Sequence, residues 1–355
     1  MQDSLISDLV AALSEKLPTD RGSFIARIKK RLGSSLQKTI DSHNTSSVIF
    51  VLDNQGQQIL LKAELGENTA THKEAGWYEH LTRIGLGGDT LYLGSAETGK
   101  FALVVLRYID GAITLDEWAV EHPSKRDQFR QMVLAMLRYD QSLFSDTATS
   151  VAQDVVEQFL VSKYHARRKE AAATRYLNDL FATRQITING RSYLTPDYAL
   201  KKLIAPPVRR KLIPEQVGLI HGDLHTGNTL IKNDMSYYVD PNGNLQMPLE
   251  YDIAKILHSV HGQYPVIMSG AFTLVEHKGG KYEFDLKRQP IYAAAHQTLQ
   301  EEVGHEQYLR SLFIGALHFA TMLPHHVQNQ LETTALFLRS TQLFGELCSL
   351  LNLRN

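Results

Sequence analysis

The sequence has very little cysteine. Cys348 is the single cysteine among 355 residues, so no disulfide can form within the chain, and a reducing compartment suits such a chain. The net charge is only −1, from 37 Lys and Arg against 38 Asp and Glu, which gives no general attraction to nucleic acid or anionic membranes. Long apolar runs are also missing, because stretches such as Phe101–Leu106 fall far short of the roughly 20 residues that span a bilayer. Asp3 and Asp8 interrupt the first apolar stretch, so no secretory signal is recognisable. We therefore expect a cytoplasmic protein without nucleic acid or membrane partners.

What is present is typical of a globular protein. The apolar residues make up 43% of the chain and the charged residues 21%, which excludes disordered and fibrous classes. The length allows one large two-lobed domain or two ordinary ones. Apolar residues recur at helical spacing over residues 5–13 and 24–32, and Gly33 suits the end of the second helix. We expect residues 1–35 to form a helical N-terminal extension.

The period then changes to that of strands. Residues 48–52 and 58–63 are apolar and strand-like, and the turn residues 53–56 between them predict a hairpin. Helical spacing follows over residues 71–84, and two more strand-like runs occupy 90–93 and 101–109. The order predicts a small sheet with one helix, so we expect residues 36–109 to form an N-terminal lobe.

After Asp110-Gly111 the chain is mainly helical. The Asn189-Gly190 pair predicts a hairpin turn. No internal repeat and no flexible linker divides this part, so we expect residues 110–355 to form one larger helical lobe. Its predicted helices cover residues 126–144, 151–181, 292–302, 307–322 and 328–351.

Polar residues gather in one segment of this lobe. A short strand ends at His221-Gly222-Asp223, and a polar loop continues to Asn228. A strand pair over residues 229–239 then delivers Asp240 at its end. Oxygen-bearing side chains on adjoining loops suit Mg²⁺, which prefers one or two carboxylates together with water and phosphate oxygens. Each turn taken alone is ordinary loop chemistry, but their order and spacing are distinctive.

That spacing resembles the catalytic and metal loops of the protein-kinase-like superfamily, in which an Asp, four residues and an Asn precede a strand pair and a second Asp. The wording HGDLHTGN, which contains Asp223 and Asn228, is similar to the aminoglycoside phosphotransferase-like (choline kinase-like) family. The resemblance implies an α+β fold of two lobes, with a small N-terminal antiparallel sheet plus helix and a larger, mainly helical C-terminal lobe. It also implies that the N-terminal lobe, residues 36–109, binds nucleotide and that the C-terminal lobe, residues 110–355, carries the catalytic loop and binds the acceptor.

The resemblance also implies roles for single residues. Asp223 would orient a substrate hydroxyl and accept its proton. Asn228 and Asp240 would hold Mg²⁺ at the phosphates of ATP. Lys62, in the second hairpin strand, would grip those phosphates, and Glu74 in the following helix would fix Lys62 through an ion pair. Glu79 competes with Glu74 for this role, and a solvent-facing Lys62 is the alternative interpretation.

Nucleotide binding departs from the protein-kinase pattern at one loop. Residues 41–47 lie where a glycine-rich loop covers the phosphates, yet they contain no glycine. Short polar side chains such as Ser46 and backbone N–H groups would meet the phosphates instead. The adenine would bond to the hinge, at the carbonyl of Arg107 and the N–H of Ile109. Because these contacts are to backbone, GTP stays open beside ATP.

The length of one loop indicates what kind of acceptor the protein would use. Only eleven residues separate Asp240 from Asp252, too few for the platform on which protein kinases bind a peptide, so a small hydroxyl-bearing molecule is the expected acceptor. His258, His261 and Tyr264 form a possible acceptor site, with surface or core packing as the alternative. The resemblance assigns structural support of the catalytic loop to His221 and Asp252, although an acidic residue in a first helical turn is also ordinary. The basic tract Lys201-Lys202 and Arg209-Arg210-Lys211 is either a solvated face or a docking patch for an acidic or phosphorylated acceptor.

The sequence therefore predicts a small-molecule kinase with ATP and Mg²⁺ as cofactors. It would move the γ-phosphate to a hydroxyl of a sugar, an aminoglycoside or a related metabolite. Two alternatives stay open: a non-catalytic nucleotide-binding scaffold, and a nucleotidyl transferase on the same fold.

Overall fold

The computed structural model describes residues 2–15, 18–41, 47–54, 56–85, 91–243, 246–287 and 289–353. These residues fold into two compact units, each described by itself. Unit 1 comprises residues 1–114, 221–223 and 228–245, and unit 2 comprises residues 115–220, 224–227 and 246–355. Both strands and helices are plentiful, which confirms the α+β class. The predicted division into an N-terminal extension (1–35), an N-terminal lobe (36–109) and a C-terminal lobe (110–355) stays a prediction.

Unit 1 is built on a five-stranded sheet in the order β1-β2-β3-β5-β4, with every neighbouring pair antiparallel. The predicted hairpin is confirmed as β2 and β3, and the last predicted strand pair appears as β4 and β5, with β4 starting two residues later than expected. The five strands are β1 (Leu36–Asp41), β2 (Val48–Asn54), β3 (Gln57–Leu65), β4 (Tyr92–Thr98) and β5 (Phe101–Arg107).

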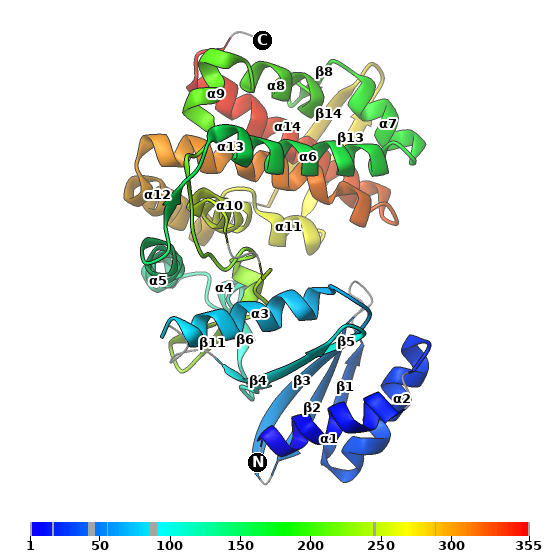
Figure 1. The fold of residues 1–355 in the computed structure, drawn as a ribbon. Helices are drawn as coiled ribbons and strands as arrows, with labels where there is room; N and C mark the ends of the chain where they lie inside the picture. The colour runs from blue at the N-terminus through cyan, green and yellow to red at the C-terminus, as the bar shows by residue number, and fades with distance from the viewer. Residues whose placement is uncertain are drawn as a thin grey trace. The chain divides into compact units, whose positions relative to one another are not determined.

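The two faces of this sheet carry different helices (Figure 1). On one face, α1 (Gln2–Glu15) and α2 (Arg21–Leu32) bury an apolar cluster that includes Phe24, Leu61 and Leu103, which confirms the predicted N-terminal helices. On the other face lies α3 (Ala70–Arg83), which contacts β3, β4 and β5. Burial of apolar side chains on both faces holds the strands in one register.

A second, smaller sheet belongs to the same unit. Its order is β12-β11-β6, formed by β11 (Thr229–Lys232), β12 (Met235–Tyr238) and β6 (Ile113–Thr114). The β11–β12 hairpin turns through Asn233 and Asp234, which both have positive φ, a conformation that Asn and Asp tolerate better than most residues. The predicted strand pair between Asn228 and Asp240 is therefore confirmed, and it places the two residues at the same end of the hairpin.

Unit 2 is mainly helical, and α10 and α13 are its most extensively packed pair. Its longer helices are α5 (Arg126–Ser145), α6 (Gln153–Ala171), α10 (Leu249–Val260), α12 (Pro290–Val303), α13 (His305–Met322) and α14 (Gln330–Leu350). The shorter ones are α4 (Leu115–Glu121), α7 (Arg175–Ala182), α8 (Pro196–Leu203), α9 (Pro206–Leu212) and α11 (Tyr264–Met268). Single turns of 3₁₀ helix occur at Gly33–Ser35 and Thr226–Asn228 and, after α13, at Leu323–His325.

Strands in unit 2 are short. A four-stranded sheet in the order β13-β14-β8-β9 contains the predicted Asn189-Gly190 hairpin, and a two-stranded one pairs β10 with β7. The strands are β7 (Thr149–Ser150), β8 (Gln185–Ile188), β9 (Arg191–Leu194), β10 (Gln216–Val217), β13 (Phe272–His277) and β14 (Lys281–Leu286). One expectation was wrong: the helix predicted over 151–181 breaks between α6 and α7, where Thr174 has an extended backbone. Within the described residues, every helix is too short or too polar to cross a membrane.

Candidate active site

The lysine expected in the second hairpin strand lies between two carboxylates. Residues of β3 alternate between the two faces of the sheet, so Leu61 and Ala63 are buried on the side of α1 and α2 while Lys62 faces the other side. Its Nζ atom lies 2.6 Å from Glu74 of α3 and 2.5 Å from Asp240. The structure thus places Lys62, Glu74 and Asp240 together within unit 1. Glu79, the competing partner, instead accepts a hydrogen bond from Ser95.

The charges of this cluster follow from its burial. The Glu74 side chain is 2% exposed, that of Lys62 12%, and that of Asp240 55%. Burial alone would lower the pKa of the Lys62 ammonium, but the two carboxylates hold it above its usual value. Burial raises the pKa of Glu74 to about 7, whereas the 2.6 Å contact with an ammonium favours the ionised carboxylate. The close contact decides, and we treat Lys62 and Glu74 as an ion pair.

The loop over residues 221–228, which is predicted to be catalytic, contributes two further side chains to the same unit. The Nδ2 of Asn228 donates to the backbone carbonyl of Asp223 at 3.0 Å and to its Oδ2 at 3.2 Å. This leaves the amide oxygen of Asn228 for another ligand. The N–H of Val239, next to Asp240, donates to the Asn228 carbonyl at 3.0 Å. Asp240 itself has a φ of 62°, a conformation uncommon outside glycine and frequent at functional sites.

The loop after Asp240, which is predicted to bind the metal, is also hydrogen-bonded to the residues before Asp223. The N–H of Asn242 donates to the carbonyl of His221 at 2.9 Å, and its Nδ2 donates to that of Gly222 at 3.3 Å. His221 is fully buried, and its ring meets the edge of Trp77 of α3 with centroids 5.8 Å apart. Helix α3 therefore touches both the lysine, through Glu74, and the catalytic loop, through Trp77. The Trp77 contact escaped the sequence reasoning, because an apolar helix position gives no sign of its partner.

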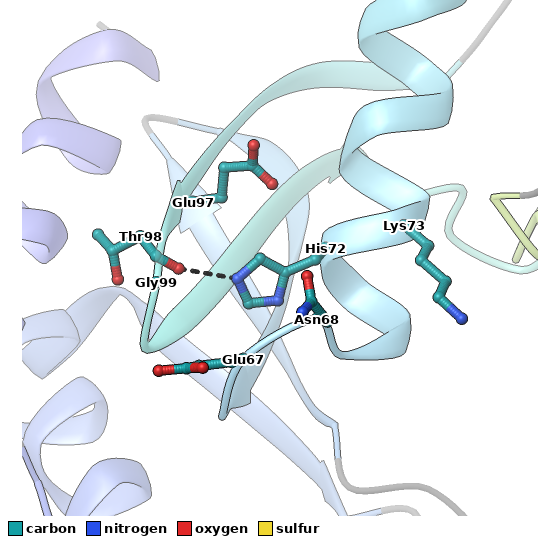
Figure 2. A pocket seen from close by; sticks show the side chains of 7 residues that line it. All are labelled: Glu67, Asn68, His72, Lys73, Glu97, Thr98 and Gly99. Carbon is teal, nitrogen blue, oxygen red and sulfur yellow. Dashed lines mark hydrogen bonds between the residues drawn. The ribbon is translucent and has the colours of Figure 1, made fainter.

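A hollow beside the start of α3 shows how this helix is anchored (Figure 2). The ring of His72 points at Thr98, and its Nε2 donates to the Thr98 carbonyl at 2.9 Å, while Nδ1 accepts from the N–H of Thr69 at 3.2 Å. Both ring nitrogens are thus engaged, Nδ1 in the cap of α3 and Nε2 with the end of β4. Lys73 points away from the ring in the same view. We interpret this hollow as structural, because the hydrogen bonds of its lining residues hold the start of α3 in place and so position Glu74.

The turn after Asp240 packs against the same helix end. Gly243 has a φ of 73°, and a Cβ atom built there would lie 2.4 Å from the backbone carbon and oxygen of Lys73. Such a distance cannot be relieved by moving a flexible side chain. Close approach of these two backbones therefore helps to place the metal loop beside Glu74.

We expect Gly243→Ala to lower the free energy of unfolding by about 2–4 kcal/mol, from a left-handed backbone and a collision with Lys73. Gly56→Ala is the matched control, because Gly56 lies in the same unit at positive φ with no atom within 4 Å of the added Cβ. It should cost only about 1–2 kcal/mol. Urea unfolding of both variants measures the difference, and equal losses would refute the backbone contact.

A cavity of about 420 Å³ in unit 1 joins these polar groups to an apolar wall. Lys62, Glu74, Asn228 and Asp240 line its polar side. Ile49 pairs with Lys62 across β2 and β3, so it faces the cavity together with Leu60. The sequence reasoning missed the apolar lining, which consists of Ile49, Leu60, Leu91, Leu106, Ala112, Leu230 and Val239. Strand alternation could have found Leu60, because it shares a face with Lys62.

The hinge residues border this cavity. Arg107, Tyr108 and Ile109 all line it. The N–H of Tyr108 is taken by the carbonyl of Gln58 at 3.2 Å, whereas the N–H of Ile109 makes no hydrogen bond within the described part of the chain. The expected adenine donor is therefore available. Ser46 lies outside the described residues; its neighbour Ser47 is buried at the cavity wall.

Unit 2 supports the catalytic loop from α10. The Oδ1 of buried Asp252 accepts the N–H of Leu224 at 3.2 Å. Two turns further along the same face of α10, the Oγ of Ser259 accepts the N–H of Thr226 at 3.3 Å. These bonds are consistent with the structural role predicted for Asp252 and add Ser259 to it.

A carboxylate that the sequence did not reveal acts on the same loop. Asp116, in the first turn of α4, accepts hydrogen bonds from the hydroxyls of Thr226 and Tyr292. Burial raises its pKa to about 6 from 3.8. Its position just after the hinge resembles any acidic residue in a first helical turn, so nothing in the sequence distinguishes it.

Asp116 should give the protein a measurable pH dependence. The unfolded carboxyl ionises near pH 3.8 and the folded one near 6, so this group's contribution to stability is complete below about pH 4 and is lost as the pH rises through 6. Asp116→Asn is neutral at every pH. We expect it to be more stable than the wild type by on the order of 2 kcal/mol at pH 8, with no difference at pH 4. Urea unfolding across this range measures the effect. Exposed Asp127→Asn is the control, and a constant difference would contradict the assignment.

The three residues of the possible acceptor site all lie in unit 2. The ring of His258 is buried, and its centroid lies 4.4 Å from the ring centroids of both Tyr264 and Phe319. His261 contacts Glu346 at 2.8 Å and stacks on His296. His258 and Tyr264 thus stay neighbours, while His261 is engaged with α14. In the basic tract, Arg209 pairs with Asp154 and Glu157, so its charge is neutralised within the fold.

Comparison with known proteins shows the family to which this chain belongs. Residues 37–269 match the model of the Phosphotransferase enzyme family. The chain therefore belongs to the phosphotransferase enzyme family. Methylthioribose kinase 1 of Oryza sativa subsp. japonica is 25% identical over 271 residues, which are 68% of this chain and 61% of that protein.

Solved structures show the same fold. A thermostable mutant of the aminoglycoside phosphotransferase APH(4)-Ia, in complex with ADP and hygromycin B, gives a TM-score of 0.55 at 12% identity and covers 89% of this chain and 96% of its own. A putative fructosamine-3-kinase from Haemophilus somnus 129PT gives 0.52 at 11% identity, covering 90% and 96%. The predicted protein-kinase-like fold is thereby confirmed.

Proposed function

We propose that the protein transfers the γ-phosphoryl group of ATP to a hydroxyl of a small molecule. The observation that carries this proposal is the contact of Lys62 with both Glu74 and Asp240, in the unit that also brings Asp223 and Asn228 together. A lysine held between a buried and an exposed carboxylate is positioned to form ion pairs with the phosphates of a nucleotide. Relatives that bind ADP or act on small hydroxyl compounds support the proposal.

The residues of unit 1 divide the chemistry among them. The apolar wall receives the base, and the free N–H of Ile109 bonds to it, as it would to guanine in GTP. Lys62 offsets phosphate charge. Asp223 orients the acceptor hydroxyl and accepts its proton. Catalysis then comes mostly from positioning and charge stabilisation, because phosphoryl transfer asks for little covalent chemistry from the protein.

A magnesium ion fits the donors present. Among the described residues no group of three His, Cys, Asp or Glu side chains forms a metal site of its own. One carboxylate of Asp240 and the amide oxygen of Asn228 instead suit an ion that takes its other ligands from phosphates and water. When bound, Mg²⁺ would neutralise developing charge on the phosphates.

Product mass tests the proposed function against its two alternatives. The protein is incubated with ATP, MgCl₂ and a panel of sugars, aminoglycosides and amino alcohols, and ADP release and product mass are measured. A gain of one phosphate on an acceptor supports the proposal. A gain of AMP would assign nucleotidyl transfer, and nucleotide binding without any product would assign a scaffold.

A further inference from the structure

A cavity in unit 2 is lined by none of the residues that the sequence assigned to a site. Helix α7, the β13–β14 hairpin and the start of α14 form its walls (Figure 1). Its volume is about 280 Å³, which is close to the lower end for small-molecule sites and far more than a metal ion fills. We name it the α7 cavity, and its polar lining includes Tyr176, Asp179, Glu276, Tyr282 and Gln330.

The charged side chains that line this cavity are acidic. They are Asp179 of α7 and Glu276 of β13, and among the described lining residues none is Lys, Arg or His. Arg175 lies one helical turn before Asp179, yet the two form no ion pair in the described part of the chain. His277 points to the other face of its strand, where its Nε2 lies 3.0 Å from Glu283. The two carboxylates of the cavity therefore keep their negative charge uncompensated.

The hydroxyl groups of the cavity are mostly committed as donors. Thr183 and Thr334 each donate to the backbone carbonyl four residues earlier, at 3.0 and 2.8 Å. Tyr282 donates to Oε1 of Glu276 at 3.2 Å. Burial, followed by the charge of Glu276, raises the pKa of Tyr282 to about 12, so this hydroxyl keeps its proton. Because a hydroxyl has one proton, all three oxygens can only accept from a ligand, and the amide of Gln330 is the ready donor among these groups.

Tyr176 adds an observation of a different kind. Its hydroxyl oxygen is buried and has no hydrogen-bond partner within the described residues, which is unfavourable until a partner is supplied. Tyr176 and Tyr282 also bring two aromatic rings to the lining, and the face of such a ring attracts an organic cation. No group of three His, Cys, Asp or Glu side chains that could hold a metal ion occurs in the described chain. The lining therefore suits an organic cation better than a metal ion.

We propose that the α7 cavity binds an organic cation with two ammonium groups, one at Asp179 and one at Glu276. An ammonium group has three N–H donors and no acceptor, which complements a lining made mainly of acceptors. Two positive charges balance the two carboxylates. Such a ligand would join α7 to the β13–β14 hairpin and stabilise unit 2. The binding does not depend on the proposed function, because a diamine without a hydroxyl cannot serve as the acceptor of that reaction.

Binding to the full chain without nucleotide tests the inference. Isothermal titration at fixed ionic strength compares putrescine with butylamine, which has one ammonium group, and with butanediol, which has none. We expect putrescine to bind about tenfold more tightly than butylamine, because it makes two ion pairs in place of one, and butanediol to bind more weakly than either amine. Glu276→Gln should bring the two amines within about threefold of each other, since glutamine keeps an oxygen for Tyr282 but loses the charge. Glu283→Gln is the matched control, because Glu283 is an exposed carboxylate of the same hairpin outside the cavity lining.

Each outcome decides for or against the inference. Equal affinities for putrescine and butylamine overturn it, as does a preference for putrescine that survives in Glu276→Gln. Displacement of putrescine by MgCl₂, but not by NaCl of the same ionic strength, would also overturn it, because the carboxylates would then be metal ligands. Should Glu276→Gln lose its helical circular dichroism, Asp179→Asn decides by the same comparison, since it removes the other charge with little change in shape. Loss of the preference in that variant, with the preference intact in Glu283→Gln, supports the inference.

Discussion

Asp223→Asn is expected to lower kcat by about 10³-fold while the affinity for ATP stays within about threefold of the wild type. The carboxylate of Asp223 can take a proton from a hydroxyl, and asparagine cannot do so. The amide has nearly the same shape, and its oxygen can still accept from the Nδ2 of Asn228, which lies 3.2 Å away. The loop should therefore keep its geometry, and the loss should appear in the chemical step alone.

Two measurements separate these effects: steady-state ADP release with a saturating acceptor, and equilibrium binding of ATP. Asp234→Asn is the control, because Asp234 is exposed in the nearby β11–β12 turn and has the positive φ that asparagine accepts. Its kcat should stay within about twofold of the wild type. An equal loss of ATP affinity and of turnover in Asp223→Asn would show that Asp223 holds the loop together and is not a base.

The parts of the site that were predictable from the sequence are those with a local signature. The family resemblance assigned Lys62 and Glu74, and in the structure strand alternation places Lys62 on the face opposite to the apolar cluster while Glu74 lies near the start of the next helix. Asp240 could be placed because a short hairpin returns the chain to Asn228. In each case a few consecutive residues, read with their period, determine where a side chain points.

The parts that escaped prediction depend on contacts between distant segments. Asp116 is one of 38 acidic residues in the sequence. Its hydrogen bond with Thr226, which is 110 residues away, distinguishes it from the others. Trp77 has an ordinary apolar position, and its importance comes from His221 on the other side of the contact. The break between α6 and α7 runs against local helix propensity, since Ala172 and Ala173 favour continuation. Tertiary contacts decide the first two, and a single sequence does not display them.

Asp240→Asn is expected to abolish the dependence of ATP binding on Mg²⁺. In the wild type, Mg²⁺ should tighten ATP binding by at least about tenfold, because a carboxylate and an amide oxygen complete the coordination of the ion at the phosphates. The variant keeps one neutral oxygen at residue 240 and loses the charge. It also loses the contact with Lys62, but the Asp240 side chain is 55% exposed, and pairs with such exposure contribute only about 0–1 kcal/mol. Lys62 keeps its buried partner Glu74, so the fold should stay intact.

Titration of ATP into the variant, with MgCl₂ or with EDTA, measures this directly, and thermal unfolding checks the fold. The two titrations should give the same affinity for Asp240→Asn and different affinities for the wild type. Asp234→Asn again serves as the control and should respond to Mg²⁺ as the wild type does. If Mg²⁺ still raised the affinity of Asp240→Asn for ATP, the ion would have to bind elsewhere. The contact between Lys62 and Asp240 would then be a structural ion pair, and Asn228 would lose its assigned role as well, because the two residues lie at one end of the same hairpin.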